Sequence, residues 1–322
     1  KVTNHISISS CWSYKKMQFP KRIFLVRHGQ SEGNVNEKAY HTIPDWKIKL
    51  TSEGEREAFE LGKKIKTIIG NEPVYIYYSP YLRTRQTLRR MLESLKSNDI
   101  YGIQEEPRIT EQQFGNFQNS AMADYKQQKR LFGNFYYRYP NGESGLDVYN
   151  RVTSFIGSLF REWCSRGSDE KFCDCNVIIV THGLSLRLFV MRWFKFTVHQ
   201  FEYSRNPDNC AIILMERQRK TSKSFHTNDG RLMNGEDGEC LKLTEESQKA
   251  LNFHVPKKTE KQYRSPFMTV EQFEHMYHFE ENIARDEKCA PCYFHCWKKY
   301  AETALIFVFI FSFILYIDFI YT

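Results

Sequence analysis

Apolar residues along the first two thirds of the chain alternate between short continuous runs and longer amphipathic stretches. Four of the runs are long enough for a buried strand and too short for a helix. They lie at residues 22–26, 74–78, 177–180 and 211–215. The stretches between them predict helices at residues 50–69, 81–95, 144–164 and 184–194. Strands that alternate with helices predict an α/β domain, here a three-layer α/β/α sandwich with a mostly parallel central sheet.

The helix predicted at residues 50–69 has sequence signals at both of its ends. Ser52, with Glu55 three residues later, forms a capping box that satisfies free backbone N–H groups at the start of a helix. Gly70 follows the last apolar position, and Pro73 lies just beyond it. We therefore expect this helix to end at Ile69.

The composition divides the chain into four segments. After Arg217, charged and polar residues replace the periodic apolar pattern, and such a segment has too few apolar residues for a packed core. We expect, in order along the chain, a disordered N-terminal extension, a folded domain, a polar and largely flexible tail, and a hydrophobic C-terminal segment. Their bounds are residues 1–17, 18–217, 218–300 and 301–322.

The hydrophobic C-terminal segment is long enough to cross a membrane if it is helical. A helix over residues 301–322 would measure about 33 Å, close to the thickness of a bilayer's hydrocarbon core. Lys298 and Lys299 flank it, as the positive-inside rule favours. Two interpretations stay open for this segment. It is either a tail anchor that tethers a cytosolic domain to a membrane, or translated AT-rich non-coding sequence, which would also be rich in Phe, Ile and Tyr.

Cysteine content and net charge indicate the cellular compartment and the kinds of ligand expected for this chain. The nine cysteines are odd in number and form no disulfide framework. The first sixteen residues lack the apolar core of a secretory signal, so we expect a reducing, cytoplasmic location. The formal net charge of +8 suits anionic ligands or an anionic membrane surface. Because Lys and Arg are spread along the chain, we expect no nucleic-acid partner.

A cluster of potential metal ligands lies just before the hydrophobic segment. It consists of Cys289, Cys292, His295 and Cys296. The spacing fits no standard zinc module. We interpret the three cysteines as free thiols, with zinc binding and palmitoylation as the alternatives. We therefore predict no metal site in this chain.

Two of the predicted strands end in the same way. The first leads into Arg27-His28-Gly29 and the third into His182-Gly183. The carboxyl ends of parallel strands are where active sites collect in α/β sheets, and a glycine lets backbone and ligand approach closely. Either histidine alone would be interpreted as an ordinary core or surface residue. Together, with an arginine beside one of them, they predict a shared pocket.

Two further segments carry charged residues that suit a phosphate. Arg83 lies near the start of the helix after the second strand, beside the free backbone N–H groups of that end. Glu111 follows a short apolar stretch and precedes Gly115. Taken singly, each of these two residues is more often a surface charge than part of a site.

Read in chain order, the four segments resemble the histidine phosphatase superfamily, also called the phosphoglycerate mutase-like family. Its motif is Arg-His-Gly, then Ser-x-x-x-Arg-x-x-x-Thr, then an acidic residue before a Gly, then a late His-Gly. Residues 79–87 match the second part at every fixed position, and 140–151 resembles a stretch of the phosphatase branch. Within the family, residues 111–118 and 192–195 are most similar to the plant phosphoglycerate mutase-like proteins. The resemblance covers about residues 20–216 and implies a phosphoglycerate mutase-like fold, with residues 18–217 as the catalytic domain.

The resemblance also implies a role for each motif residue. His28 is expected to be the nucleophile, because a neutral imidazole nitrogen can attack phosphorus and leave a labile phosphoramidate. Glu111 is expected to protonate the leaving alkoxide and then to activate water. A cationic cage is expected to bind the phosphoryl oxygens and to make a metal or other cofactor unnecessary. The cage consists of Arg27, Asn34, Arg83, His182 and Gly183.

These expectations together predict a metal-independent phosphatase that hydrolyses a phosphomonoester through a phosphohistidine intermediate. The alternatives are a cofactor-dependent phosphoglycerate mutase and a non-catalytic binder of a phosphorylated ligand. Hydrolysis is favoured because the region between Gly115 and Gly142 is rich in aromatic residues and shows no counterpart of the mutase insertion. Those aromatic residues either contact a substrate ring or pack on the core. They are Phe132, Phe135, Tyr136, Tyr137 and Tyr139.

The substrate is left open by the sequence. Segments 35–50 and 116–145 are expected to set specificity, and they match no particular ligand. A small phosphorylated molecule is the expected substrate. Sugar phosphates, nucleotides, phosphoglycerate and phosphoproteins would all offer the same phosphoryl group, and the oligomeric state is equally open.

Overall fold

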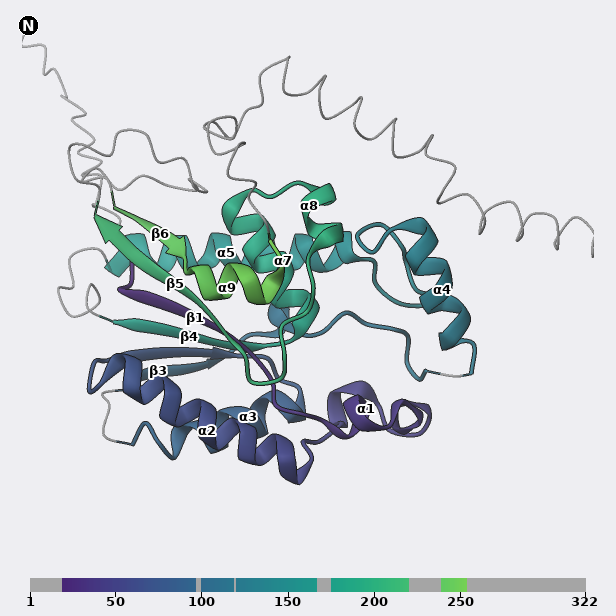
Figure 1. The fold of residues 1–322 in the computed structure, drawn as a ribbon, viewed down its shortest axis with the longest axis horizontal. Coiled ribbons are helices and arrows are strands. Elements are labelled where there is room, and N and C mark those ends of the chain that lie inside the picture. Colours follow the sequence, from purple (N-terminus) through teal and green to yellow (C-terminus); the bar gives the residue numbers. More distant parts are fainter. Residues whose placement is uncertain (1–18, 97–99, 119, 167–174, 220–238, 254–322) are drawn as a thin grey trace, which may run out of the picture. The chain divides into compact units, whose positions relative to one another are not determined.

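The computed structural model describes residues 19–96, 100–118, 120–166, 175–219 and 239–253 (Figure 1). A six-stranded sheet forms the centre of this part of the chain, with the strand order β3-β2-β4-β1-β5-β6. The strands are β1 (Arg22–Arg27), β2 (Val74–Tyr78), β3 (Ile100–Glu105), β4 (Asn176–Thr181), β5 (Ile212–Arg219) and β6 (Glu239–Leu243). β3, β2, β4 and β1 pair in parallel, whereas β5 and β6 run antiparallel. The predicted mostly parallel sheet is confirmed.

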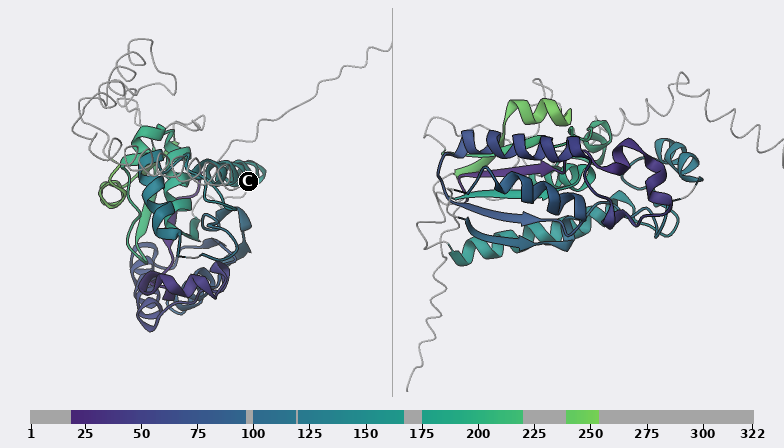
Figure 2. Two further views of the ribbon diagram at one scale, coloured as in Figure 1. Left: turned by 90° about the vertical axis from the view of Figure 1, so that its right-hand side faces the viewer. Right: turned by 90° about the horizontal axis from the view of Figure 1, so that it is seen from below.

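Helices cover both faces of the sheet, as Figures 1 and 2 show. Alternate residues of β1 point to opposite faces. Phe24 and Val26 pack with apolar residues of α2 (Ser52–Ile69) and α3 (Leu82–Leu92). Ile23 and Leu25 pack with apolar residues of α5 (Gly145–Arg166) and α7 (Gly183–Phe194). The central strands are therefore buried on both sides, and the predicted three-layer sandwich is confirmed.

The remaining helices are short and lie in the connections. The α-helices are α1 (Glu32–Val35), α4 (Met122–Phe132), α8 (Val198–Tyr203) and α9 (Glu245–Leu251). The 3₁₀ helices are η1 (Glu37–His41), η2 (Asp45–Lys47) and η3 (Pro107–Ile109). Several of these connections follow the carboxyl ends of strands, where they build the site described below.

Helix α2 begins one residue away from the predicted cap. Thr51, not Ser52, is the N-cap, and its hydroxyl oxygen accepts a hydrogen bond from the backbone N–H of Gly54 at 3.0 Å. The helix ends at Ile69 as predicted. Gly70 follows with φ of 56°, a conformation that glycine adopts without the steric cost of a side chain.

The domain extends beyond residue 217, which corrects the predicted tail. β6 pairs antiparallel with β5, and Met215 lies opposite Leu243 in that ladder. Leu241, Leu251 and Phe253 are buried in the same apolar cluster as α5 and α7. The expectation of a flexible tail from residue 218 is therefore wrong for residues 239–253, because their apolar side chains complete the core.

Three predicted features lie outside the described residues. They are the N-terminal extension, the cysteine cluster at 289–296 and the hydrophobic segment 301–322. In the described part of the chain, no helix is both long enough and apolar enough to cross a membrane. The tail anchor therefore stays a prediction.

Candidate active site

The two histidines predicted to share a pocket lie side by side at the end of the sheet. His28 follows β1 and His182 follows β4, and these strands pair in parallel with Arg27 opposite Thr181. The ring centroids of the two histidines are 5.2 Å apart. His28 is 3% exposed and His182 is fully buried. The geometry thus brings together two imidazoles that are 154 positions apart in the sequence (182 − 28).

Hydrogen bonds define the state of the His28 ring. Its Nδ1 lies 2.8 Å from the backbone oxygen of Gly29, which can only accept, so Nδ1 carries the proton of the neutral ring. Its Nε2 accepts a hydrogen bond from Nε of Arg83 at 3.2 Å. Burial, with the charges of Arg83 and Arg27, holds the pKa of His28 well below its usual range. His28 is therefore a neutral imidazole with a lone pair on Nε2.

His182 is held through its other nitrogen. Its Nε2 lies 2.8 Å from the Ser79 hydroxyl. Its Nδ1 is buried and has no hydrogen-bond partner among the described residues. Burial, with the charge of Arg83 and the neighbouring His28, holds the pKa of His182 well below its usual range. The Tyr81 ring packs edge-on against the imidazole, with centroids 5.0 Å apart.

Arg83 enters the site from the first turn of α3 and is buried. One of its terminal nitrogens donates to both the backbone oxygen and the carboxylate of Asp45, each at 2.8 Å. Asp45 lies in η2, inside a segment expected to set specificity, but its ion pair with Arg83 was not predicted from the sequence. The ion pair fixes the plane of the guanidinium while its Nε faces His28.

Arg27 is the last residue of β1 and brings a second positive charge. A terminal nitrogen donates to the backbone oxygen of Pro207 at 2.7 Å. Its Nε is buried and has no hydrogen-bond partner among the described residues. A buried donor of this kind is ordinarily satisfied by a protein group, a water or a ligand.

Glu111 lies in the loop after η3 and has a perturbed carboxyl group. Burial raises the pKa of Glu111, while a hydrogen bond from the Gln112 backbone and the charges of Arg83 and Arg27 oppose the shift. The Gln112 N–H donates to the carboxyl oxygen at 2.9 Å. A carboxyl group with a raised pKa can hold a proton at a pH where an exposed one is ionised.

The loop that carries Glu111 is held by two residues of the stretch 140–151, which resembles a stretch of the phosphatase branch. Arg151 donates to the backbone oxygens of Arg108, Thr110 and Glu111 at 2.8 to 2.9 Å. Two of its nitrogens also donate to the Glu143 carboxylate at 3.0 Å. This pair therefore positions the Glu111 loop, and the charge of Arg151 also contributes to the lowered pKa of His182.

The other two predicted phosphate ligands are close to the site but differ in their surroundings. Asn34 is exposed, and its side-chain oxygen accepts from the backbone and hydroxyl of Ser31 at 3.0 Å and from Asn209 at 3.2 Å. Any hydrogen bond to a phosphate would thus come from its Nδ2. Gly183 begins α7, and a Cβ there would lie 2.8 Å from Cγ of Asn206, so the close packing requires glycine.

Two contacts made by the motif at residues 79–87 were not predicted from the sequence. Of the fixed residues in the Ser-x-x-x-Arg-x-x-x-Thr stretch, only the arginine was assigned a role. Ser79 contacts His182, and the Thr87 hydroxyl accepts from the Gly29 N–H at 3.0 Å. The fixed positions of the motif were a signal for both residues. Each residue of the motif therefore supports one of the two histidine segments.

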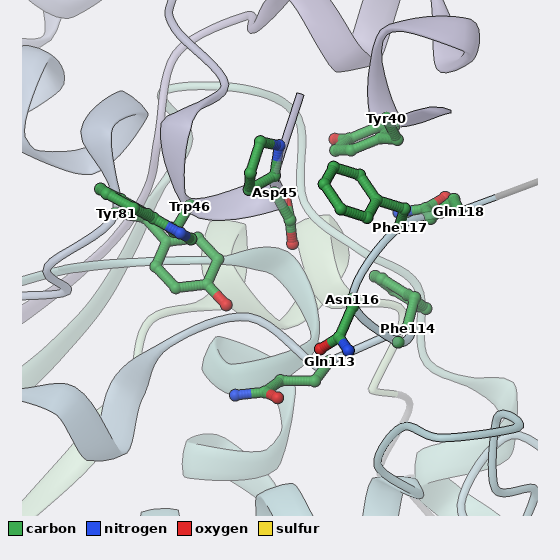
Figure 3. A pocket seen from close by; sticks show the side chains of 11 residues that line it. Tyr40, Asp45, Trp46, Tyr81, Gln113, Phe114, Asn116, Phe117 and Gln118 are labelled. Atoms are coloured by element: carbon green, nitrogen blue, oxygen red, sulfur yellow. The ribbon is translucent and has the colours of Figure 1, made fainter. Parts of the chain in front are cut away.

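A cavity of about 300 Å³ has Tyr81, the residue that packs against His182, in its wall (Figure 3). It is lined by residues from 40–46 and 113–118, together with Tyr81. These segments overlap those predicted to set specificity. The aromatic residues predicted from 132–139 do not line it: Phe135, Tyr137 and Tyr139 are buried in the core. For these three, the interpretation as packing residues is the right one.

Comparisons with known proteins agree with this architecture. Residues 23–230 match the family model of the histidine phosphatase superfamily (branch 1). Because the match covers more than half of the chain, the protein belongs to the histidine phosphatase superfamily. The resemblance noted from the motifs is confirmed.

Individual relatives are consistent with that membership. The phosphoglycerate mutase-like protein AT74H of Arabidopsis thaliana is 44% identical over 213 residues, which cover 63% of this chain and 76% of that protein. The broad-range acid phosphatase DET1 of Saccharomyces cerevisiae is 29% identical, with 61% of this chain and 85% of that protein covered. A solved structure titled mycobacterial hydrolase 1 has a TM-score of 0.52 and 18% identity, covering 70% of this chain and 97% of that chain. It has the same fold.

Proposed function

We propose that this protein is a metal-independent phosphatase that hydrolyses a phosphomonoester through a phosphohistidine on His28. The observation that carries the proposal is the state of the His28 ring. The Gly29 carbonyl fixes the proton on Nδ1, and the low pKa keeps Nε2 unprotonated. The nucleophilic lone pair therefore faces Arg83, a group suited to hold a phosphoryl oxygen.

In the first step, Nε2 of His28 attacks phosphorus while the bond between phosphorus and the leaving oxygen breaks. Glu111, whose pKa is raised by burial, gives its proton to that oxygen. The unpartnered Nε of Arg27 and Nδ1 of His182, with the guanidinium of Arg83, would hold the phosphoryl oxygens. The charge that develops in the transition state is thereby offset without a metal ion.

In the second step, the Glu111 carboxylate takes a proton from water as the water oxygen attacks phosphorus. The N–P bond breaks and its electron pair returns to Nε2 of His28. The products are the alcohol and inorganic phosphate, and both residues recover their starting states. One carboxyl group thus serves as acid and then as base.

Two observations favour hydrolysis over the alternatives. The relative DET1 is named a broad-range acid phosphatase. A non-catalytic phosphate binder would gain nothing from an acid with a raised pKa near the same two arginines, Arg83 and Arg27, that keep His28 neutral. A phosphoglycerate mutase would use the same first step but pass the phosphoryl group to a phosphoglycerate rather than to water.

The test follows phosphate release by the full chain from a panel of phosphomonoesters in EDTA. Release should persist in EDTA and fall by on the order of 10³-fold or more in His28→Ala, because the nucleophile is lost. His199→Ala, a histidine of α8, is the matched control and should keep its activity. If the folded wild type released no phosphate, the proposal would be wrong, and 3-phosphoglycerate with a bisphosphoglycerate primer would then separate a mutase from a binder.

A further inference from the structure

The cavity lined by Tyr81 has two aromatic sides (Figure 3). Tyr81 and Trp46 lie on one side, and Tyr40, Phe114 and Phe117 lie on the other. Trp46 and Phe117 are more than half exposed, so their rings are accessible to a ligand. Its volume, about 300 Å³, is at the lower end of the range for small-molecule pockets and suits one ring system.

Two residues of the cavity wall, Tyr81 and Asp45, also contact the phosphate cage. Tyr81 contacts the His182 ring on one side, and the guanidinium carbon of Arg83 lies 4.9 Å from the centre of the Tyr81 ring. Asp45, at the cavity wall, accepts from Arg83. A substrate whose phosphoryl group lies at His28 and which extends past Tyr81 would place its remaining part in this cavity.

The aromatic walls are anchored to the folded domain. Phe114 packs edge-on against the buried Tyr139, with ring centroids 4.8 Å apart. The backbone N–H of Gln118 donates to the backbone oxygen of Tyr40 at 3.2 Å, which ties the two lining segments together. Gly115, between them, has a φ of 104° that disfavours any other residue. The site is thus largely formed before a ligand arrives.

The described residues of the lining offer no cation for a second anionic group on the substrate. Among them, Asp45 is the charged one, and its carboxylate is already paired with Arg83. The polar groups beside it are the carboxamides of Gln113, Asn116 and Gln118. Carboxamides both donate and accept hydrogen bonds, so they suit the polar edge of an uncharged ring.

On the basis of the proposed function, we propose that the alcohol portion of the substrate carries a planar heteroaromatic ring, as in a nucleoside 5′-monophosphate. The ring stacks on the aromatic walls and meets the carboxamides with its polar edge. The phosphoryl group lies at His28 and the ribose spans the distance between the two. An uncharged ring needs no cation from the lining, whereas the carboxylate of a phosphoglycerate would find none among the described residues of that lining.

The experiment compares kcat/KM of the full chain for adenosine 5′-monophosphate, ribose 5-phosphate and 3-phosphoglycerate. The first two compounds have the same leaving oxygen and differ only in the base. Base stacking on aromatic side chains predicts a preference of roughly tenfold for the nucleotide over ribose 5-phosphate. 3-Phosphoglycerate should be the poorest of the three.

Variants of two exposed phenylalanines test whether the preference for the nucleotide over ribose 5-phosphate arises in the cavity. Phe117→Ala should lower the ratio of the two kcat/KM values toward one. Phe132→Ala, an exposed phenylalanine outside the cavity, should leave the ratio unchanged. Three results would each overturn this inference while leaving the phosphatase proposal in place. They are equal kcat/KM values for the nucleotide and ribose 5-phosphate, a higher kcat/KM for 3-phosphoglycerate than for the nucleotide, and an unchanged ratio in Phe117→Ala. A wild type that released phosphate from none of the three would overturn both.

Discussion

The two histidines at the strand ends present opposite ring nitrogens to the site. His28 is tied through Nδ1 to a backbone oxygen, and His182 is tied through Nε2 to the Ser79 hydroxyl. Because their sequence surroundings are both His-Gly, the difference comes from the neighbouring elements. This difference separates the roles of the two rings: Nε2 of His28 is the proposed nucleophile, and Nδ1 of His182 is the position that a phosphoryl oxygen can approach.

At the same scale, the two perturbed pKa values predict an acidic pH optimum. Protonation of Nε2 removes the nucleophile, so kcat/KM should rise with pH through the pKa of His28, which lies well below the usual histidine range. Ionisation of Glu111 removes the proton for the leaving group, so kcat/KM should fall through the pKa of Glu111, which is raised. A pH profile of kcat/KM with an alkyl phosphate should be bell-shaped, with its maximum on the acidic side of neutrality.

Glu111→Gln tests whether Glu111 causes the fall of kcat/KM on the alkaline side of that profile. The variant should lose about 10²–10⁴-fold in kcat/KM and no longer show the alkaline decline, because the group that ionises is gone. With 4-nitrophenyl phosphate the loss should be smaller, since that leaving group needs little protonation. Glu111 would not be the acid if the variant still showed the alkaline decline, or if its kcat/KM fell by the same factor with both substrates.

At the scale of elements, the four predicted strands, β1, β2, β4 and β5, are the inner strands of the sheet, and the two that were missed form its edges. β1, β2 and β4 show as continuous apolar runs because helices cover them on both sides. β3 is an edge strand whose residues are mostly exposed, and β6 is a five-residue edge strand that follows a long polar stretch. An edge strand buries little, so its sequence carries a weak apolar signal, and neither strand was predicted.

The contribution of β6 to stability can be measured directly. Leu241 is buried in the core cluster of α5 and α7, so Leu241→Ala should lower the free energy of unfolding by about 2–5 kcal/mol. Leu131→Ala, at a half-exposed position on α4, should change it by no more than about 0.5 kcal/mol. Urea denaturation of both full-length variants tests this. Equal midpoints for the two variants would contradict the placement of β6 in the core.

At the scale of the whole described domain, the parallel strands assemble the site. β1, β4 and β2 are neighbours in the sheet, so the segments that follow them bring His28, His182 and Ser79 to one edge. This convergence could be predicted because each of these residues lies directly after a strand. Asp45 could not, because it comes from a connection whose path depends on tertiary packing. The same holds for the aromatic cavity, which combines residues from separate connections.

The central claim is that His28 carries the phosphoryl group. The most direct measurement mixes the full chain with a ³²P-labelled phosphomonoester, quenches it in alkali and maps the label by tryptic digestion. The label should be stable in alkali, released by acid and confined to the peptide of residues 28–38, as trypsin cleaves after Arg27 and Lys38. It should be absent from His28→Ala. Label on another peptide, or phosphate release with label-free protein at every quench time, would contradict the account.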